Sequence, residues 1–365
     1  MTGANQQGAA RKAAFRAASL SKRYPRILER TLVGVEDPSI VAGIGRLGAF
    51  LAGDTPLGRP SDLDDPYWKA FYERHAGLSS HEIDFLELEY LAFHEILRAH
   101  RYFERWIDPF AVDKVMDMDL VLTSYEVLFD RIKTPGEALR TSLLGNAHDA
   151  SQLKINTDGT LLNPEALHFE VPAGRIEIIC DNAGHEFLSD LVLAAFLLRS
   201  GTQVVHLHVK AMPWFVSDVT LADAETVFAA LEKPAHAQTD FAAVLLMGLS
   251  SGRLRLEAHP LWTQPLCFGE EHLSAALGAG ADLVIIKGDL NYRRAISDVS
   301  TNVFTPWADL PYRPDRDLFS LRSVKSHCWV GMSLDRWPAG VDPADFPTDG
   351  SIFLPQTIKG QQSSS

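Results

Sequence analysis

The chain has 365 residues, 46% of them hydrophobic and 22% charged, which is typical of a folded globular protein and excludes wholesale disorder, collagen-like repeats and a coiled coil. The formal net charge of -13 at pH 7 repels phosphate backbones, so we expect no nucleic-acid partner. The longest apolar runs reach less than half of the about 20 residues that a membrane-spanning helix needs, so we expect no membrane partner.

The first 28 residues carry six basic side chains and no acidic one, which is the composition of a transit peptide. We favour a simpler interpretation, an irregular start followed by an amphipathic helix with Phe15, Leu20 and Ile27 as candidate core contacts. From about residue 11 to residue 144 the periodic segments are helical, most clearly over residues 83–97. The Pro- and Gly-rich segment 53–60 predicts a surface loop. We therefore expect a helical N-terminal region over residues 1–163.

After Asn163 the pattern changes to short β-rich runs that alternate with helical segments. The runs predict strands over residues 175–180, 203–209, 253–257, 283–286 and 318–322, and helices over residues 184–199, 221–231 and 270–277. Strands separated by helices are typical of βαβ units. Residues 164–365 are thus expected to form an α/β domain, a three-layer, Rossmann-like, mostly parallel sheet with helices on both faces.

The three cysteines, Cys180, Cys267 and Cys328, are widely spaced and form no Cys-x-x-Cys pair. They predict neither a disulfide framework nor a thiolate zinc site, and they fit a reducing, cytoplasmic compartment. Cys180 precedes Asp181, and we expect it to serve packing.

Polar segments follow the predicted strands, at the carboxyl ends where open α/β sheets bind their ligands. These segments are DNAGHE at 181–186, PWFVSD at 213–218, KGDLNYR at 287–293 and SVK at 323–325. Asp181, Asn182 and Asp218 together make an all-oxygen ligand set, which hard divalent cations such as Mg²⁺ or Mn²⁺ prefer.

Positive charge is available at the same strand ends. Lys287, Arg293 and Lys325 would surround the site with cations, as an anionic substrate such as a phosphate ester requires. Each cluster alone has an ordinary explanation, since an Asp-Asn pair before a helix is commonly an N-cap. Four such clusters, all at predicted strand ends, favour a site.

These segments resemble the signature segments of the damage-control phosphatases, a metal-dependent family formerly catalogued as domain of unknown function 89. The segments GDLNYR at 288–293 and RSVK at 322–325 are similar to those of subfamily III, described both as acidic-residue (protein-glutamate) methyltransferases and as sugar-phosphate phosphatases. The resemblance covers about residues 143–332 and includes residues 144–149, which have the family form Gly-Asn-x-x-Asp. Ser323 stands where the subfamily pattern has Thr, and it keeps the hydroxyl.

The resemblance implies a metal-dependent phosphatase that acts in metabolite damage control and hydrolyses small phosphate monoesters, with sugar phosphates such as fructose 1-phosphate or fructose 6-phosphate as the expected substrates. It implies Mn²⁺, Ni²⁺ or Co²⁺, with Mg²⁺ also open, held by Asp181, Asn182 and Asp218. Asp218 and Lys325 would be catalytic, with Asp218 either attacking phosphorus or orienting water. The expected substrate-binding residues are Asp181, Asn182 and Lys325 together with a substrate-holding turn. The residues of this turn are Asp289, Leu290, Asn291, Tyr292 and Arg293.

Other interpretations remain open. One is an S-adenosylmethionine-dependent protein-glutamate O-methyltransferase, although only Gly184 is available for the Gly-rich loop that this cofactor commonly needs. Another is a non-enzymatic sugar-phosphate sensor. The segment from Asp117 to Asp119 mimics the nucleophile motif of haloacid dehalogenase phosphatases but lacks the preceding buried strand. His206 and His208 share a strand face and form a candidate transition-metal pair; with no third ligand recognisable nearby, we favour packing.

Overall fold

The computed structural model describes residues 3–145, 159–168, 170–268, 272–277, 280–310, 313–337, 341–342 and 346–361. The chain divides into two compact units. The helical unit comprises residues 12–111, and the sheet unit comprises residues 1–11 and 112–365. The sequence placed a boundary after residue 163 instead. The difference lies in helices α7 (Met118–Arg131) and α8 (Pro135–Gly145), which pack on helix α9 (His185–Arg199) of the sheet unit. Of the family-like segment 144–149, residues 146–149 lie outside the described residues.

The helical unit contains helices α2 (Tyr24–Thr31), α3 (Pro38–Ala52), α4 (Pro66–His75), α5 (Phe85–Ala99) and α6 (Tyr102–Arg105), and helix α1 (Gly3–Ala18) runs into it. Asp37, Asp65 and Asp84 begin α3, α4 and α5, and each side chain accepts backbone N–H groups of the first turn. The predicted helix over residues 83–97 is confirmed as α5, and residues 53–60 form the predicted loop. Among the described residues, none of the helices has the length and apolar character that a membrane crossing needs.

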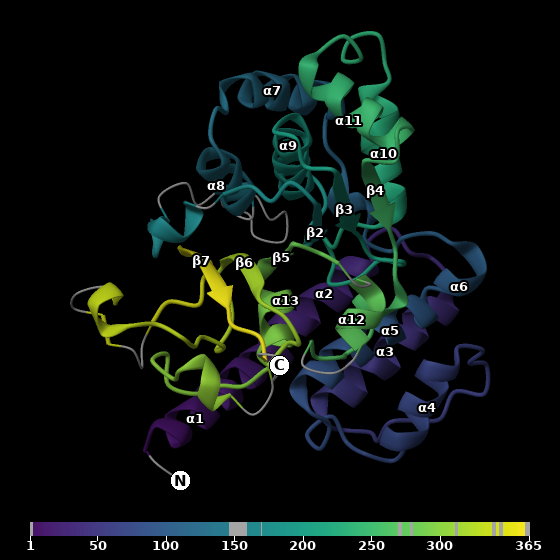
Figure 1. Ribbon diagram of the computed structural model, residues 1–365. Helices are drawn as coiled ribbons and strands as arrows, with labels where there is room; N and C mark the ends of the chain where they lie inside the picture. Colours follow the sequence, from purple (N-terminus) through teal and green to yellow (C-terminus); the bar gives the residue numbers. More distant parts are fainter. Residues whose placement is uncertain are drawn as a thin grey trace. The chain divides into compact units, whose positions relative to one another are not determined.

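The sheet unit contains a sheet of seven strands in the order β1-β7-β6-β5-β2-β3-β4 (Figure 1). The strands are β1 (Thr160–Leu161), β2 (Arg175–Ile179), β3 (Val204–His208), β4 (Leu254–Glu257), β5 (Leu283–Lys287), β6 (Leu318–Ser323) and β7 (Ile352–Ile358). Only the β6–β7 pair is antiparallel in this described sheet. The predicted α/β fold is confirmed, and the five predicted strands are β2 to β6; β1 and β7 were not predicted.

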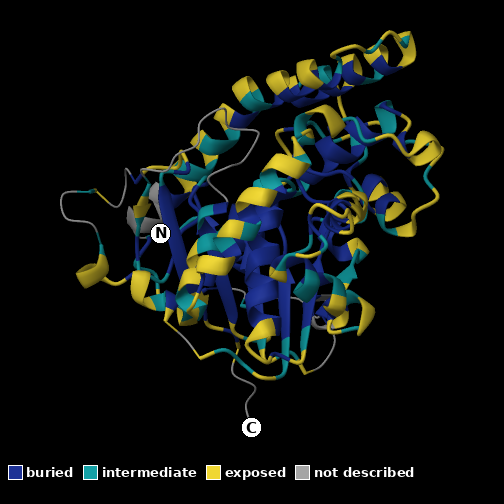
Figure 2. Ribbon diagram, turned by 90° about the horizontal axis from the view of Figure 1, so that it is seen from above, coloured by how far each residue is buried: buried dark blue, intermediate teal, exposed yellow. Residues whose placement is uncertain are grey.

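Helices cover both faces of the sheet, as predicted (Figure 1). One face packs against α7, α8 and α9 together with α10 (Leu221–Leu231) and α11 (Asp240–Ser250), through a core that includes Ile176 and Ile178 of β2. The other face packs against α12 (His272–Leu277) and α13 (Gly288–Ala295), through a core that includes Ile179 and Ile286. Figure 2 shows the strands buried between these layers.

The connections turn in opposite directions at β2. From β2 the chain proceeds to β3 and β4 on one side, and then returns to β5 and β6 on the other side. The carboxyl ends of β2 and β5 therefore flank a topological switch point, where open parallel sheets bind their ligands. Asp181 follows β2 and Gly288 follows β5.

Candidate active site

The three predicted metal ligands lie together at the carboxyl end of β2. Asn182 and Asp218 form an isolated antiparallel bridge, and the N–H of Val219 donates to the carbonyl oxygen of Asp181 at 2.9 Å. Asp181, Asn182 and Asp218 are 7%, 6% and 1% exposed. Segments some 35 residues apart in the chain thus converge on one buried point, as the strand-end pattern predicts.

The backbone before Asp218 is held in an unfavourable conformation. Phe215 and Val216 have φ values of 44° and 72°, in the left-handed region that non-glycine residues avoid. Such residues cost about 1–3 kcal/mol each and are concentrated at functional sites. Here they turn the chain so that the carbonyl oxygen of Ser217 accepts from the N–H of Ala183 at 2.7 Å. The strain therefore seats Asp218 against the β2 end.

Hydrogen bonds fix the orientation of the Asn182 carboxamide. Its Nδ2 donates to Glu186 Oε2 at 2.7 Å and to Asp181 Oδ2 at 3.1 Å, so this atom must be the nitrogen. Its Oδ1 accepts from the Ser217 hydroxyl at 2.6 Å. The amide oxygen is consequently directed toward the Ser217 and Asp218 segment.

Negative charge accumulates at this point and is only partly balanced. Burial raises the pKa of Asp181 well above its ordinary value, and the charges of Glu186 and Asp218 raise it further. Lys210 and Lys325 act in the opposite direction. Lys210, which is 1% exposed, lies with its Nζ 3.4 Å from Asp218 Oδ2. A divalent cation would relieve this repulsion, and two carboxylates with an amide oxygen form a donor set that suits it.

Gly288 brings strand β5 against the same carboxylate. Its φ is 79°, and a Cβ built on it would lie 1.9 Å from Asp181 Oδ2. Only glycine fits this position, because both the backbone conformation and the space exclude a side chain. The next residue, Asp289, accepts at Oδ1 from Arg322 Nη1 at 2.8 Å and from the N–H of Lys325 at 3.3 Å. Asp289 thereby fixes the backbone of Lys325 beside the β5 end.

The segment expected as a substrate-holding turn is instead the start of helix α13. Leu290 is half-buried, whereas Asn291 is buried with its Nδ2 donating to the carbonyl oxygen of Lys287 at 2.9 Å. The Tyr292 hydroxyl lies 3.2 Å from Gln356 Oε1, and Arg293 Nε donates to Asp298 at 2.7 Å. Successive helical residues point in different directions, so the segment cannot present all its side chains to one ligand.

Lys287 occupies a different place from the one expected. Its Nζ is wholly buried and donates to Asp190 Oδ1 at 2.7 Å and to the Ser142 hydroxyl at 2.9 Å, with Glu186 Oε1 at 3.5 Å. The lysine is the last residue of β5 and faces α8 and α9 rather than the predicted mouth. Burial raises the pKa of Asp190 to about 6, although Lys287 opposes this rise.

Two residues near the site escaped the sequence prediction. Lys210 comes two residues after β3 and forms an ion pair with Asp218. Its position just after a strand end, which also singled out Asp181, is the feature of the sequence that could have identified it. Glu186, 1% exposed, lies four residues beyond Asn182 in the first turn of α9 and orients its amide. The sequence placed Glu186 in a signature segment without a role.

A small cavity adjoins the cluster. It has a volume of about 150 Å³ and is lined by Asp113, Lys114, Val115, Met116, Ala183, Gly184, His185 and Ser217. The competing haloacid dehalogenase motif is nearby in the chain but has the wrong context, because Asp117 is the N-cap of α7 and a 3-10 helix, Ala111–Lys114, precedes it instead of a strand.

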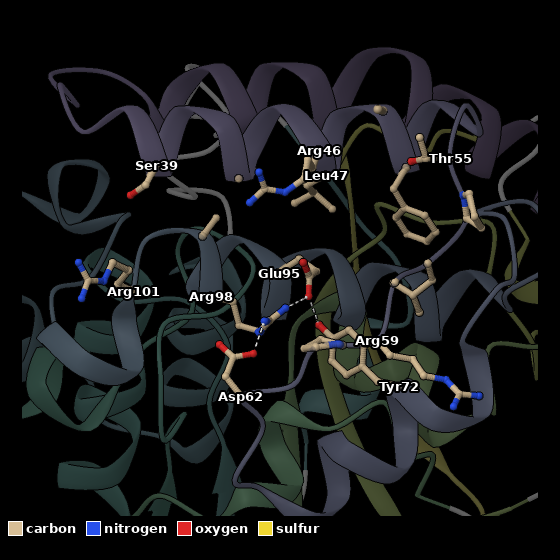
Figure 3. A pocket seen from close by; sticks show the side chains of 18 of the residues that line it. Ser39, Arg46, Leu47, Thr55, Arg59, Asp62, Tyr72, Glu95, Arg98 and Arg101 are labelled. Atoms are coloured by element: carbon tan, nitrogen blue, oxygen red, sulfur yellow. Dashed lines mark hydrogen bonds and ion pairs between the residues drawn. The ribbon is translucent and has the colours of Figure 1, made fainter.

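A larger cavity, of about 660 Å³, lies within the helical unit (Figure 3). Arg98 lies on its lining, with guanidinium nitrogens 2.7 Å from Glu95 Oε1 and 2.7 Å from Asp62 Oδ1. Tyr72 donates to the same Glu95 oxygen. None of the site residues predicted from the sequence lines this cavity, in the part of the chain that the structure describes.

A family model described as the damage-control phosphatase ARMT1-like domain matches residues 73–336. Similar curated proteins are named damage-control phosphatase ARMT1. The protein from Danio rerio is 36% identical over 166 residues, which cover 43% of this chain and 37% of that protein. The one from Homo sapiens is 31% identical over 206 residues, covering 53% and 46%. The chain thus spans less than half the length of these relatives.

A solved DUF89 family protein from Pyrococcus horikoshii has a TM-score of 0.49 and 15% identity, and the match covers 86% of this chain and 91% of that chain. The fold and site described above define an α/β protein with an oxygen-ligand cluster at the switch point of a mostly parallel sheet. The chain belongs to the ARMT1-like damage-control phosphatase domain family.

Proposed function

We propose that this protein is a divalent-metal-dependent phosphatase that hydrolyses small phosphate monoesters. One observation carries the proposal: Asp181, Asn182 and Asp218 converge at the switch point, and Lys210 and Lys325 are the cations that act on them. Family membership supports the same activity, since the curated relatives are named as phosphatases.

The metal fits the residues present. Asp181, Asn182 and Asp218 would hold it, because their donors are oxygens and their combined negative charge is buried. When bound, a divalent cation supplies Lewis-acid stabilisation of phosphoryl oxygens. We propose Mn²⁺, Co²⁺ or Ni²⁺, with Mg²⁺ as a further choice.

The chain's own cations then serve the phosphate. We expect Lys325, whose backbone N–H donates to Asp289, to bind a phosphate oxygen and to stabilise the charge that develops during transfer. Lys210, with its Nζ 3.4 Å from Asp218 Oδ2, sets a positive charge beside this carboxyl group. Asp218 can therefore act as a nucleophile toward phosphorus or orient the attacking water.

The substrate class in this proposal is the sugar phosphates, with fructose 1-phosphate and fructose 6-phosphate as the compounds to test first. The purpose is the removal of damaged or surplus phosphorylated metabolites, as the family name indicates. The cytoplasmic location expected from the cysteine pattern is part of the same proposal.

Paired variants test the assignment. Asp218→Asn keeps the shape of the side chain but removes its charge, and we expect phosphate release to fall by about 100-fold or more, as for the loss of a key charged group. Asp117→Asn is the matched control, because Asn caps a helix as well as Asp does and the control should keep the activity. A near-normal rate in Asp218→Asn would refute the assignment. Loss of activity in Asp117→Asn alone would favour the haloacid dehalogenase mechanism instead.

A further inference from the structure

A second cluster of metal-ligating side chains lies inside the sheet, where β2 pairs with β3. Glu177 is opposite His206 in the strand register, and His208 is two residues further along β3. Glu177 Oε2 lies 2.6 Å from His208 Nε2 and 3.3 Å from His206 Nδ1. The three ligand atoms all lie within 4.8 Å of one another. The third ligand that the sequence of β3 lacks is therefore supplied by the neighbouring strand.

The cluster is buried and separate from the candidate active site. Glu177, His206 and His208 are 0%, 5% and 1% exposed. They face the α12 side of the sheet, because Val205 and Leu207 fill the opposite core and the His208 ring lies 5.1 Å from that of Trp262. Asp181 lies four positions after Glu177 in the chain, which corresponds to about 13 Å of extended backbone at 3.3 Å per residue.

Each imidazole directs one ring nitrogen at the Glu177 carboxylate, His206 through Nδ1 and His208 through Nε2. Arg175 Nη2 lies 3.3 Å from His206 Nδ1, and a guanidinium can only donate, so in this contact His206 Nδ1 is the unprotonated ring nitrogen and its lone pair accepts from Arg175. His206 Nε2 and His208 Nδ1 are buried and, within the described part of the chain, have no hydrogen-bond partner.

We propose that Glu177, His206 and His208 bind a divalent transition-metal ion of the Zn²⁺ and Co²⁺ group. Two imidazoles and one carboxylate are a characteristic donor set for these ions, and they differ from the oxygen donors at Asp181. On binding, the metal takes the place of the proton shared by His208 and Glu177, and that proton is released to solvent. The site does not depend on the phosphatase activity proposed above.

Arg175 makes the proposal sharply testable. Its Nε pairs with Glu177 Oε1, so it balances the carboxylate when the cluster holds no metal. The side chain is 29% exposed, and its Nη2 also donates to the carbonyl oxygen of Leu277 at 2.6 Å. A metal next to this guanidinium would be repelled by it. Arg175→Gln should therefore tighten metal binding on the order of tenfold. If the cluster serves only as an ion pair, it binds no metal and the substitution does not increase metal affinity.

Cobalt spectroscopy on the full chain supplies the measurement. Metal-stripped protein is titrated with Co²⁺, because Co²⁺ held by imidazoles in a four-coordinate site absorbs strongly in the visible range and Co²⁺ held by oxygens alone absorbs weakly. We expect a strong band that Asp218→Asn retains and His208→Gln abolishes. His259→Gln is the matched control, since His259 lies on the same side of the sheet but accepts from the Leu261 N–H at 3.1 Å.

The outcomes separate the alternatives. A strong band that survives in His208→Gln, or no strong band in the wild-type protein, would overturn the proposal. Circular dichroism verifies that each variant is folded. If His208→Gln does not fold, the Arg175→Gln titration decides, because tighter Co²⁺ binding supports the site and unchanged or weaker binding refutes it. A band lost in Asp218→Asn but kept in His208→Gln would place the metal at the candidate active site alone.

Discussion

Replacing Gly288 by alanine tests how closely β5 approaches the Asp181 carboxylate. The new Cβ would lie 1.9 Å from Asp181 Oδ2, and real Cβ atoms essentially never come closer than 3.0 Å, so one of the two groups must move by about 1.1 Å. The φ of 79° adds strain of about 1–2 kcal/mol, because an alanine in the left-handed region is disfavoured. Displacing the neighbouring carboxylate adds about 1–3 kcal/mol, as overpacking does elsewhere.

Gly252→Ala is the matched control for this substitution. Gly252 has a φ of 74°, and nothing lies within 4 Å of a Cβ built on it, so the control has the strain without the collision. We expect Gly252→Ala to lower the free energy of unfolding by about 1–2 kcal/mol and to leave turnover unchanged. Gly288→Ala should destabilise more and lower turnover on the order of 100-fold, which is the effect of a misplacement of about 1 Å.

Urea denaturation and phosphate release measure the two effects, and Mn²⁺ titration calorimetry reports the affinity of the metal site directly. Equal stability and equal Mn²⁺ affinity in the two alanine variants would refute the packing of Gly288 on Asp181. A Gly288→Ala variant that loses stability but keeps Mn²⁺ affinity would show that Asp181 is not a metal ligand.

Three further predictions concern the surroundings of the site and the helical unit. Tyr292→Phe should lower the free energy of unfolding by about 1 kcal/mol without changing KM, because the hydroxyl contacts Gln356 rather than the cluster; a raised KM with unchanged stability would contradict this placement. Lys287→Met should destabilise by about 3–5 kcal/mol, because it leaves Asp190 buried without its cation, and Asp190→Leu in the same chain should restore part of the loss in urea denaturation. Burial, followed by the charge of Arg98, lowers the pKa of His94 to about 3. Between pH 6.5 and 3 this histidine is therefore protonated in the unfolded chain but neutral in the folded protein. The stability of the helical unit should fall by about 1.4 kcal/mol per pH unit from pH 6.5 toward 3, and His94→Gln should flatten this slope, with an unchanged slope as the contrary result.

The central strands were predictable because each is a short apolar run between helical segments. Strand β7 was not, since it contains Pro355, which normally argues against a strand, and since its partners β1 and β6 are distant in the chain. Strand β1 is only two residues long and has no pattern to recognise. Helix α13 is polar in sequence, and it is held in place by Tyr292 and Ala295, which reach the core beneath β5.

The convergence of Asp181, Asn182 and Asp218 followed from one rule, that parallel strands end at the same edge. The directions of side chains after those ends could not be predicted in the same way. Lys287 faces the α9 side because strand residues alternate between faces, and Arg293 pairs with Asp298 because α13 rotates it away.

Side-chain contacts between neighbouring strands also could not be predicted from the sequence. The pairing of Glu177 with His208 depends on the register of β2 against β3, and a shift by one residue would send each side chain to the opposite core. Lys210 meets Asp218 only because the strained segment at Val216 turns the chain back toward β3.

The most direct test of the proposed phosphatase is phosphate release from fructose 1-phosphate by metal-stripped protein, with Mn²⁺, Co²⁺, Ni²⁺ and Mg²⁺ added back singly. The account predicts no release without metal, release with at least one of these ions, and loss of that release in Asp218→Asn. Fructose 6-phosphate and other sugar phosphates then rank the substrates. Tight metal binding without release from any sugar phosphate would contradict the phosphatase and favour the sensor or the S-adenosylmethionine-dependent methyltransferase.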